Sequence, residues 1–112
     1  MGLKSQLVYF SRLCYSNKFV AATDGNISVR TPNNFILSTP TSLSKGKVKA
    51  ADLVKTDIKG KVVKGTKKPS TELKLHAYIY QSRKDINAIV HTHPKFASAF
   101  AVAVPCALSL EP

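Results

Sequence analysis

The 112-residue sequence predicts an α/β domain in which helices cover a largely antiparallel sheet. Three observations favour this class. Residues 3–19 and 70–83 place apolar side chains at helical spacing. Residues 27–37 and 53–64 each contain two short alternating segments joined by a turn, which is the pattern of a β-hairpin. The length leaves room for one domain, covering residues 1–112.

The composition is that of an ordinary globular protein, with 44% hydrophobic and 21% charged residues. No apolar run approaches the roughly 20 residues that a membrane-spanning helix needs. Polar residues interrupt the N-terminal segment, so it does not resemble a signal peptide. Cys14 and Cys106 lie far apart and form no C-x-x-C pair, so we expect a reducing, cytoplasmic location.

The charge is strongly positive, with 17 Lys and Arg against six Asp and Glu, for a net +11. Such a field attracts phosphate-bearing partners, from nucleic acids to small anions. Nucleic-acid-binding surfaces favour Arg and interleave aromatic side chains, whereas the lysine-rich residues 45–74 contain no aromatic side chain. We therefore interpret the lysines as a solvated surface and do not expect a nucleic-acid partner.

The first predicted helix, over residues 3–19, is amphipathic. Leu3, Leu7, Phe10 and Leu13 or Cys14 recur at helical spacing and are expected to face a core. A turn at residues 24–26 then leads into the first hairpin.

Between the hairpins, residues 38–42 collect hydroxyl groups on a loop and residues 48–53 form a short helical turn. The second helix begins around Ser70-Thr71-Glu72. Ser70 or Thr71 can act as its N-cap, and a carboxylate in the first turn suits the positive end of the helix dipole.

After this helix, residues 88–91 are predicted to form a buried strand. Pro94 suits the first turn of a further helix, whose apolar positions are Phe96, Ala97, Phe100 and Ala101.

His91 and His93 predict a metal site. Side chains two apart on a strand point the same way, so both imidazoles can reach one point. Glu72 stands at the start of the preceding helix, and one Glu with two His is a known zinc ligand set. The alternative is a pair of ordinary structural histidines. His76, one turn after Glu72, is expected to orient Glu72 or pack beneath it rather than bind metal.

Three pairs of small residues lie where backbone N–H groups are commonly free: at a turn, a loop and a helix start. If they converge beside a divalent ion, they form a pocket for a phosphorylated, carbonyl-bearing substrate. The pairs are Gly25-Asn26, Thr41-Ser42 and Ser70-Thr71.

Four segments in this order resemble the class II aldolase/adducin family: residues 25–30 (GNISVR), 39–41 (TPT), 68–72 (KPSTE) and 90–93 (VHTH). The nearest patterns are those of fuculose-phosphate and rhamnulose-phosphate aldolases and ribulose-phosphate 4-epimerases. The resemblance implies a three-layer αβα fold with a mostly antiparallel sheet, a sugar-phosphate substrate and a homo-oligomer.

The resemblance also implies roles for the candidate residues. His91 and His93 would be Zn²⁺ ligands, and Glu72 a ligand that can leave the metal to act as general base or acid. The reaction would be retro-aldol cleavage of a ketose phosphate to dihydroxyacetone phosphate and an aldehyde. Glu rather than Asp at position 72 favours an aldolase over an epimerase. The substrate phosphate would be held by Gly25, Asn26, Thr41, Ser42, Ser70 and Thr71.

The sequence also departs from the family. Family members are about double this length and use a third zinc-binding histidine and a tyrosine from their C-terminal part. Here no histidine follows His93 and no tyrosine follows Tyr80, and Ser42 replaces the usual Gly. We therefore expect an N-terminal part, from a fragment or a truncated gene, with a weaker zinc site and impaired activity. The alternatives are a pentulose-phosphate 4-epimerase and a non-catalytic, adducin-like interaction module.

Overall fold

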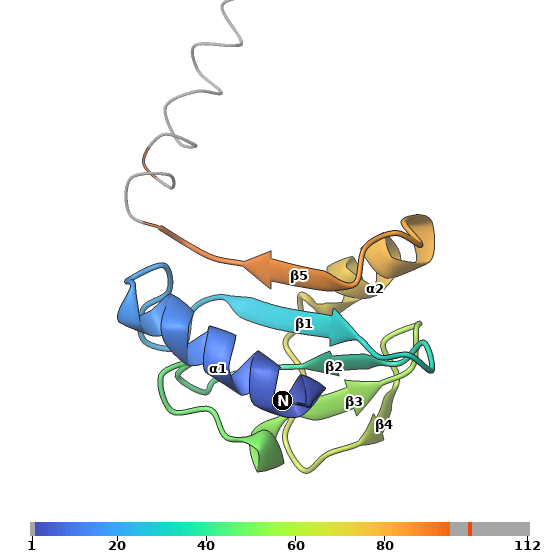
Figure 1. Cartoon of the computed structure of the whole chain (residues 1–112), viewed down its shortest axis with the longest axis horizontal. Helices are drawn as coiled ribbons and strands as arrows, with labels where there is room; N and C mark the ends of the chain where they lie inside the picture. Colours follow the sequence, from blue (N-terminus) through green and yellow to red (C-terminus); the bar gives the residue numbers. More distant parts are fainter. Residues whose placement is uncertain (1, 95–98, 100–112) are drawn as a thin grey trace, which may run out of the picture.

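The computed structural model describes residues 2–94 and residue 99. Its helices and strands follow one another in the predicted order. No helix in this part of the chain is long and apolar enough to cross a membrane. The elements are α1 (Leu3–Ser16), β1 (Asn26–Arg30), β2 (Ile36–Ser38), the 3₁₀ turn η1 (Ala50–Asp52), β3 (Val54–Thr56), β4 (Val62–Lys64), α2 (Leu73–Ser82) and β5 (Ala88–His91) (Figure 1).

The five strands form one sheet in the order β4-β3-β2-β1-β5. Every neighbouring pair is antiparallel, as predicted. The hairpins β1–β2 and β3–β4 lie side by side because β2 also pairs with β3. Helix α2 carries the chain from β4 at one edge to β5 at the other, so β5 pairs with β1.

Alternation along the strands builds a core on each face of the sheet. On one face Ile27 and Leu37 pack with Leu7 of α1, Val48 and Leu53. On the other, Ile36 packs with α2 through Leu73, Ala77 and Tyr80. Helices therefore cover both faces, and the predicted three-layer αβα architecture is confirmed (Figure 1).

Helix α1 faces the sheet with only part of the predicted side. Leu7 and Ser11 are its buried residues, whereas Phe10 is 51% and Leu13 41% exposed. The prediction is wrong for Phe10, whereas Leu7 is buried as predicted, and of the alternatives Leu13 and Cys14 it is Cys14 that packs against the core. The buried face also includes Cys14, which packs partly on the core, and the Ser11 hydroxyl is satisfied by the Leu7 carbonyl at 2.6 Å.

The start of α2 differs in detail from the prediction. The helix begins at Leu73 with Glu72 at the N-cap position, and the Glu72 side chain makes no capping hydrogen bond. The Ser70 hydroxyl accepts the N–H of Glu72 at 3.2 Å, inside the turn that precedes the helix. The Glu72 carboxylate is thus free of capping and can reach other groups.

Strand β5 is not buried, contrary to the prediction. It lies at the edge of the sheet, and Val90 is 55% exposed although it pairs with buried Ile27. The edge position explains the difference, because a strand there has a neighbour on one side only. The helix predicted over Phe96, Ala97, Phe100 and Ala101 lies outside the described residues.

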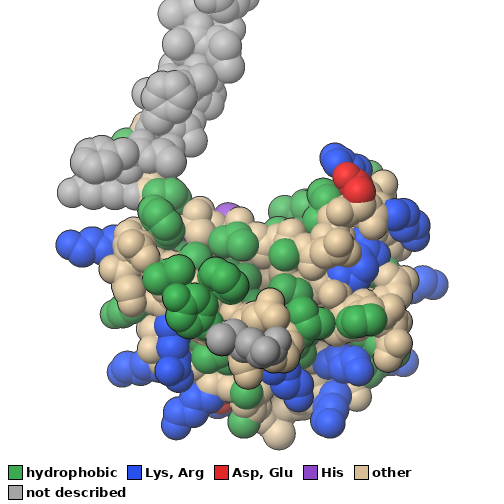
Figure 2. All heavy atoms as spheres, viewed as in Figure 1, with side chains coloured by type: hydrophobic (Ala, Val, Ile, Leu, Met, Phe, Trp, Pro, Cys, Tyr) green, Lys and Arg blue, Asp and Glu red, His purple; other side chains and the backbone are tan. Residues whose placement is uncertain are grey.

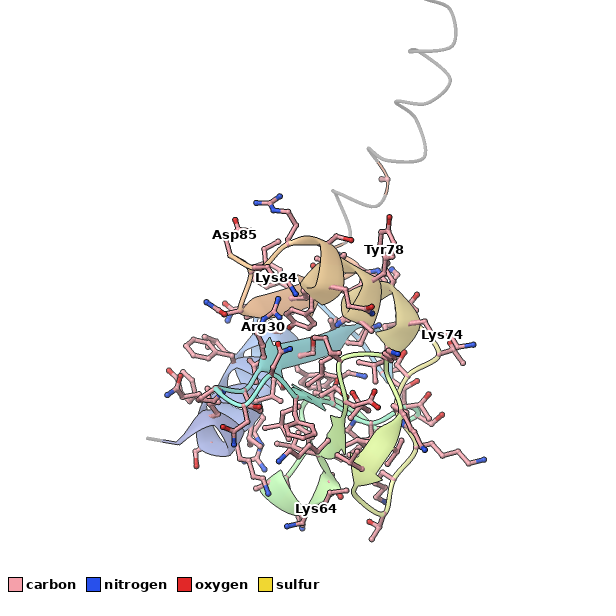
Figure 3. The ribbon with its side chains drawn as sticks, turned by 90° about the vertical axis from the view of Figure 1, so that its right-hand side faces the viewer. Arg30, Lys64, Lys74, Tyr78, Lys84 and Asp85 are labelled. Atoms are coloured by element: carbon pink, nitrogen blue, oxygen red, sulfur yellow. The ribbon has the colours of Figure 1, made fainter. Side chains whose placement is uncertain are left out.

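Arg30 fixes the end of α2 to β1. Its guanidinium donates to the carbonyls of Tyr80 at 2.7 Å, Arg83 at 2.9 Å and Ile86 at 3.1 Å. It also lies 4.9 Å from the centre of the Tyr80 ring. Figure 3 shows Arg30 below this end of the helix, while Tyr78 and Lys74 project outward. Arg30, which falls in the GNISVR segment, thus has a structural role here.

Candidate functional site

The candidate residues meet at one end of the sheet. Because the strands are antiparallel, the start of β1 lies beside the ends of β2 and β5. Asn26 at the start of β1 pairs directly with His91 at the end of β5. Residues far apart in the sequence are therefore brought together by strand pairing alone.

The Glu72 carboxylate is the centre of the cluster. Its Oε2 lies 2.7 Å from Nδ1 of His91 and also accepts a hydrogen bond from the Asn26 amide. Asn26 Nδ2 is 3.3 Å from the same imidazole nitrogen. The rings of His91 and His93 lie with centroids 4.7 Å apart and planes inclined by 42°.

These contacts affect the protonation of Glu72. The hydrogen bond from Asn26 holds the pKa of the Glu72 carboxyl below its usual range, and the contact with His91 adds to this effect, although burial opposes both. Glu72 is thus an anion at neutral pH. If Nδ1 of His91 donates to this carboxylate, its Nε2 keeps a lone pair that can bind a metal.

The donor set fits zinc in type, since it combines two imidazoles and a carboxylate. Its present arrangement is one of mutual hydrogen bonding. Within residues 2–94, no group of three or more His, Cys, Asp or Glu side chains is placed to hold a metal ion. In this arrangement Oε2 of Glu72 is engaged by both His91 and Asn26.

The pairs predicted to hold phosphate lie on three segments that meet at this end of the sheet. Pro40 and Pro69 form an isolated β-bridge, and the Thr41 N–H donates to the Lys68 carbonyl at 2.8 Å. This bridge places the loop that carries Thr41-Ser42 against the segment that leads into Ser70-Thr71. Gly25-Asn26 joins them through the bond from Asn26 to Glu72. The N–H of Thr41, however, already has a protein acceptor.

Two backbone conformations shape this end of the sheet. Gly25 has φ +77°, and a Cβ at this position would lie 2.5 Å from Val20 Cγ1 and 2.8 Å from the His91 carbonyl oxygen. The turn before β1 can therefore approach β5 only with glycine. Ser42 has φ 58°, a left-handed conformation that favours glycine.

His76 lies inside the molecule rather than in the cluster. It is 2% exposed, and its Nδ1 is 2.7 Å from the Ser28 hydroxyl, which in turn contacts the Tyr80 hydroxyl at 2.8 Å. Burial, with a smaller effect of the His91 charge, lowers the pKa of His76 to about 4. The sequence predicted that His76 orients Glu72 or packs beneath it. The burial agrees with packing, and the side-chain partner of His76 is Ser28.

Lys45 is a buried residue near the site that the sequence pattern did not single out. It is 2% exposed, and its Nζ donates to the carbonyls of Thr23 at 3.1 Å and Leu43 at 3.3 Å. It is one of many lysines in residues 45–74, and nothing local in the sequence marks it as buried.

His93 is held at the border of a hollow. Its backbone N–H donates to the Phe19 carbonyl at 2.9 Å. The hollow has a volume of about 580 Å³ and is walled by the end of α1 and the segment after it, including Tyr15, Val20 and Ala22. None of the six residues predicted to hold phosphate lines it.

Comparisons with known proteins identify the family to which the chain is similar. The chain is 40% identical over 97 residues to an L-fuculose phosphate aldolase of Methanococcus maripaludis, covering 87% of this chain and 52% of that protein. A solved L-fuculose 1-phosphate aldolase superposes with a TM-score of 0.82 and 33% identity, over 88% of this chain and 47% of the other. The Thermus thermophilus L-fuculose-1-phosphate aldolase gives 0.77 and 26%, over 90% and 51%.

The chain thus spans about half the length of the curated relatives it matches. Residues 5–110 match the family described as "Class II Aldolase and Adducin N-terminal domain". The chain belongs to the class II aldolase and adducin family.

Proposed function

We propose that this chain carries the zinc and phosphate site of a sugar-phosphate aldolase, which cleaves a ketose phosphate to dihydroxyacetone phosphate and an aldehyde. The observation that supports this most directly is the contact of Glu72 with both His91 and Asn26 at the sheet end where the small-residue pairs gather. The names of relatives, including the M. maripaludis L-fuculose phosphate aldolase, agree with the proposal.

His91 and His93 would hold Zn²⁺, with Glu72 as the third donor. When bound, the metal supplies the Lewis acidity that carbon–carbon cleavage next to a carbonyl requires. The six small residues would orient the substrate through its phosphate. Asn26 serves both sets, because its side chain holds Glu72 while its backbone leads from Gly25 into β1.

Glu72 would move the proton. In a retro-aldol cleavage the hydroxyl group loses its proton as the C–C bond breaks, and the carbon left by the aldehyde gains one. A carboxylate that exchanges its partner by a side-chain rotation can serve such a transfer. The Asn26 and His91 contacts favour its ionised form, which is the form that accepts a proton.

A 4-epimerase is the second candidate, and a relative favours it. The chain is 38% identical over 109 residues to a Mycoplasma pneumoniae protein named "Probable L-ribulose-5-phosphate 4-epimerase UlaF". An epimerase would run the same cleavage and add the aldehyde back on its other face. The two reactions therefore differ in release: an aldolase releases dihydroxyacetone phosphate or an analogous fragment, whereas an epimerase does not.

Zinc binding is the first test. We expect the chain to bind zinc in a competition titration with a chromophoric chelator, and His91→Ala or His93→Ala to weaken binding at least tenfold. His76→Gln is the matched control, since it removes an imidazole that is not a proposed ligand. Failure of the unmutated chain to bind zinc would contradict the zinc site.

Catalysis is the second test. Zinc-loaded protein would be incubated with fuculose 1-phosphate, and dihydroxyacetone phosphate would be measured with a coupled dehydrogenase. Release that is lost in Glu72→Gln supports the aldolase. Conversion of a pentulose phosphate to its epimer without release supports the epimerase. Zinc binding without either reaction would support the metal site and contradict catalysis by this chain alone.

A further inference from the structure

The chain buries a positive charge behind the candidate phosphate site. Among the Lys and Arg residues of the described chain, Lys45 is the one with a fully buried side chain. Burial of an ammonium group is costly unless an acidic group pairs with it. No carboxylate within residues 2–94 forms an ion pair with Lys45. Its charge is therefore left without a direct counter-ion.

The hydrogen bonds of Lys45 join two loops. Nζ donates to the Thr23 carbonyl, two residues before Gly25, and to the Leu43 carbonyl, directly after Ser42. The two loops carry Gly25-Asn26 and Thr41-Ser42, which are four of the six proposed phosphate contacts. An ammonium group has three N–H donors, so two carbonyl acceptors leave one donor over.

The electrostatic surroundings point to the same site. Burial lowers the pKa of Lys45, whereas the charges of Asp24 and Glu72 raise it. Glu72 therefore lies close enough to affect this ammonium group, which links Lys45 to the candidate cluster as well as to the two loops. A phosphate held between these loops would supply the missing negative charge.

We propose that Lys45 is a positioning residue of the phosphate site, which clamps the two loops together and supplies a fixed positive charge that favours a doubly charged phosphate. This inference rests on the proposed function, because it takes the small-residue pairs as the phosphate contacts. Lys45 is separate from the proposed zinc ligands and acts through the loops and through its charge.

The first experiment measures binding of inorganic phosphate by calorimetry at constant ionic strength. We expect Lys45→Met to weaken binding at least tenfold. Lys47→Met removes the same charge from an exposed position two residues away, and its affinity should stay within about twofold of the unmutated protein, because exposed charges are screened by solvent and salt. Equal affinities for the two variants would overturn the proposal.

Two further variants separate the clamp from the charge. Lys45→Gln keeps N–H donors but removes the charge, and Lys45→Arg keeps the charge. We expect phosphate binding to be weakened in Lys45→Gln and partly restored in Lys45→Arg. Thermal unfolding of each variant shows whether it is folded. If all three Lys45 variants fail to fold, the residue serves stability alone and the proposal is wrong.

The same variants distinguish this inference from the proposed function. If the unmutated protein binds no phosphate, the phosphate site itself is wrong and the inference falls with it. If it binds phosphate and the Lys45 variants bind equally well, only the inference fails. In the cleavage assay, Lys45→Met should raise KM for the phosphorylated ketose at least tenfold, while kcat changes less and kcat/KM for the unphosphorylated sugar falls less than kcat/KM for the phosphorylated one.

Discussion

At the scale of single residues, backbone conformation determines how closely the parts of the site approach. Gly25 lets the turn before β1 lie against the His91 carbonyl, and Asn26 then reaches both His91 and Glu72. Ser42 adopts the left-handed conformation without being a glycine. Both positions lie in loops, where a change of one atom alters the position of several neighbours.

Substitution of Gly25 should disturb fold and site together. In Gly25→Ala the added Cβ meets Val20 and the His91 carbonyl, and the left-handed φ adds roughly 1–2 kcal/mol of strain. We expect a loss of about 2 kcal/mol or more in the free energy of unfolding by urea, and weaker zinc binding. Gly60→Ala is the control, because it has φ +90° but an open site, with Ala77 Cβ at 3.9 Å. Equal losses for the two variants would mean that the close contact at Gly25 does not matter.

Substitution of Ser42 by glycine should stabilise the fold, in contrast to substitution of Gly25. Ser42→Gly relieves the cost of φ 58°, and we expect a gain of about 0.5–1 kcal/mol in the free energy of unfolding, after allowing for the greater freedom of glycine in the unfolded chain.

Lys18→Gly provides an independent comparison. Lys18 has φ 61° and follows the C-cap of α1, where Phe19 N–H bonds to the Cys14 carbonyl in a Schellman motif that favours glycine. A gain for Lys18→Gly without one for Ser42→Gly would show that the Ser42 side chain stabilises the loop in its present form.

At the scale of elements, α2 separates two kinds of polar residue. Glu72 at its start turns toward β5, while His76 one turn later is buried against β1 and bonds to Ser28. The inner side of α2 thus combines apolar packing with a hydrogen-bonded network that contains a titratable group.

His76 should make the stability of the fold depend on pH. Its pKa is lowered to about 4 in the folded state, so the unfolded chain binds the proton more readily. The contribution of neutral His76 to the free energy of unfolding is fully present above pH 6.5. It is lost as the pH falls toward 4, by up to about 3 kcal/mol. Urea unfolding of the unmutated protein and His76→Gln between pH 7 and 4 should show a shallower dependence for the variant. If the free energy of unfolding falls equally with pH in both proteins, groups other than His76 cause the loss of stability in acid. The carboxyl groups with lowered pKa titrate in a more acidic range.

The elements themselves could be predicted because their signals are local. Helical spacing, turn residues and alternation locate α1, α2 and both hairpins within a few residues. The exposure of β5 could not be predicted, since its edge position depends on how the strands are ordered. The exposure of Phe10 could not be predicted either, because Phe10 and Leu7 have the same apolar character.

Some residues of the candidate site could be predicted from the sequence and others could not. His91 and His93 stand out because their strand is otherwise apolar, and Glu72 because it stands at a helix start. The structure brings the three together. Their roles stay predictions. Lys45 gave no signal, because its burial depends on carbonyls of two distant loops, contributed by Thr23 and Leu43.

At the scale of the whole molecule, charge and apolar surface are distributed unevenly. The chain has a net charge of +11, and the only Lys or Arg ion pair within residues 2–94 joins Arg83 to Asp85. Hydrophobic side chains gather over α1 on the face shown in Figure 2, with Lys and Arg around them. Association of copies through this face would bury apolar surface against a general electrostatic repulsion.

We call Tyr9, Phe10 and Leu13 the α1 patch, whose members are 52%, 51% and 41% exposed. Exposed apolar patches commonly mark interfaces, and the family resemblance predicts a homo-oligomer, so we expect a second copy to cover this patch. Light scattering after size-exclusion chromatography should give a multiple of 12.2 kDa, with association strengthened by salt because the repulsion is screened.

Phe10→Lys should lower the mass while circular dichroism shows that the helices remain. Tyr78→Lys on α2, where Tyr78 is 68% exposed, is the matched control and should leave the mass unchanged. A single-chain mass for the unmutated protein, or an unchanged mass for Phe10→Lys, would show that the α1 patch is not an interface between copies.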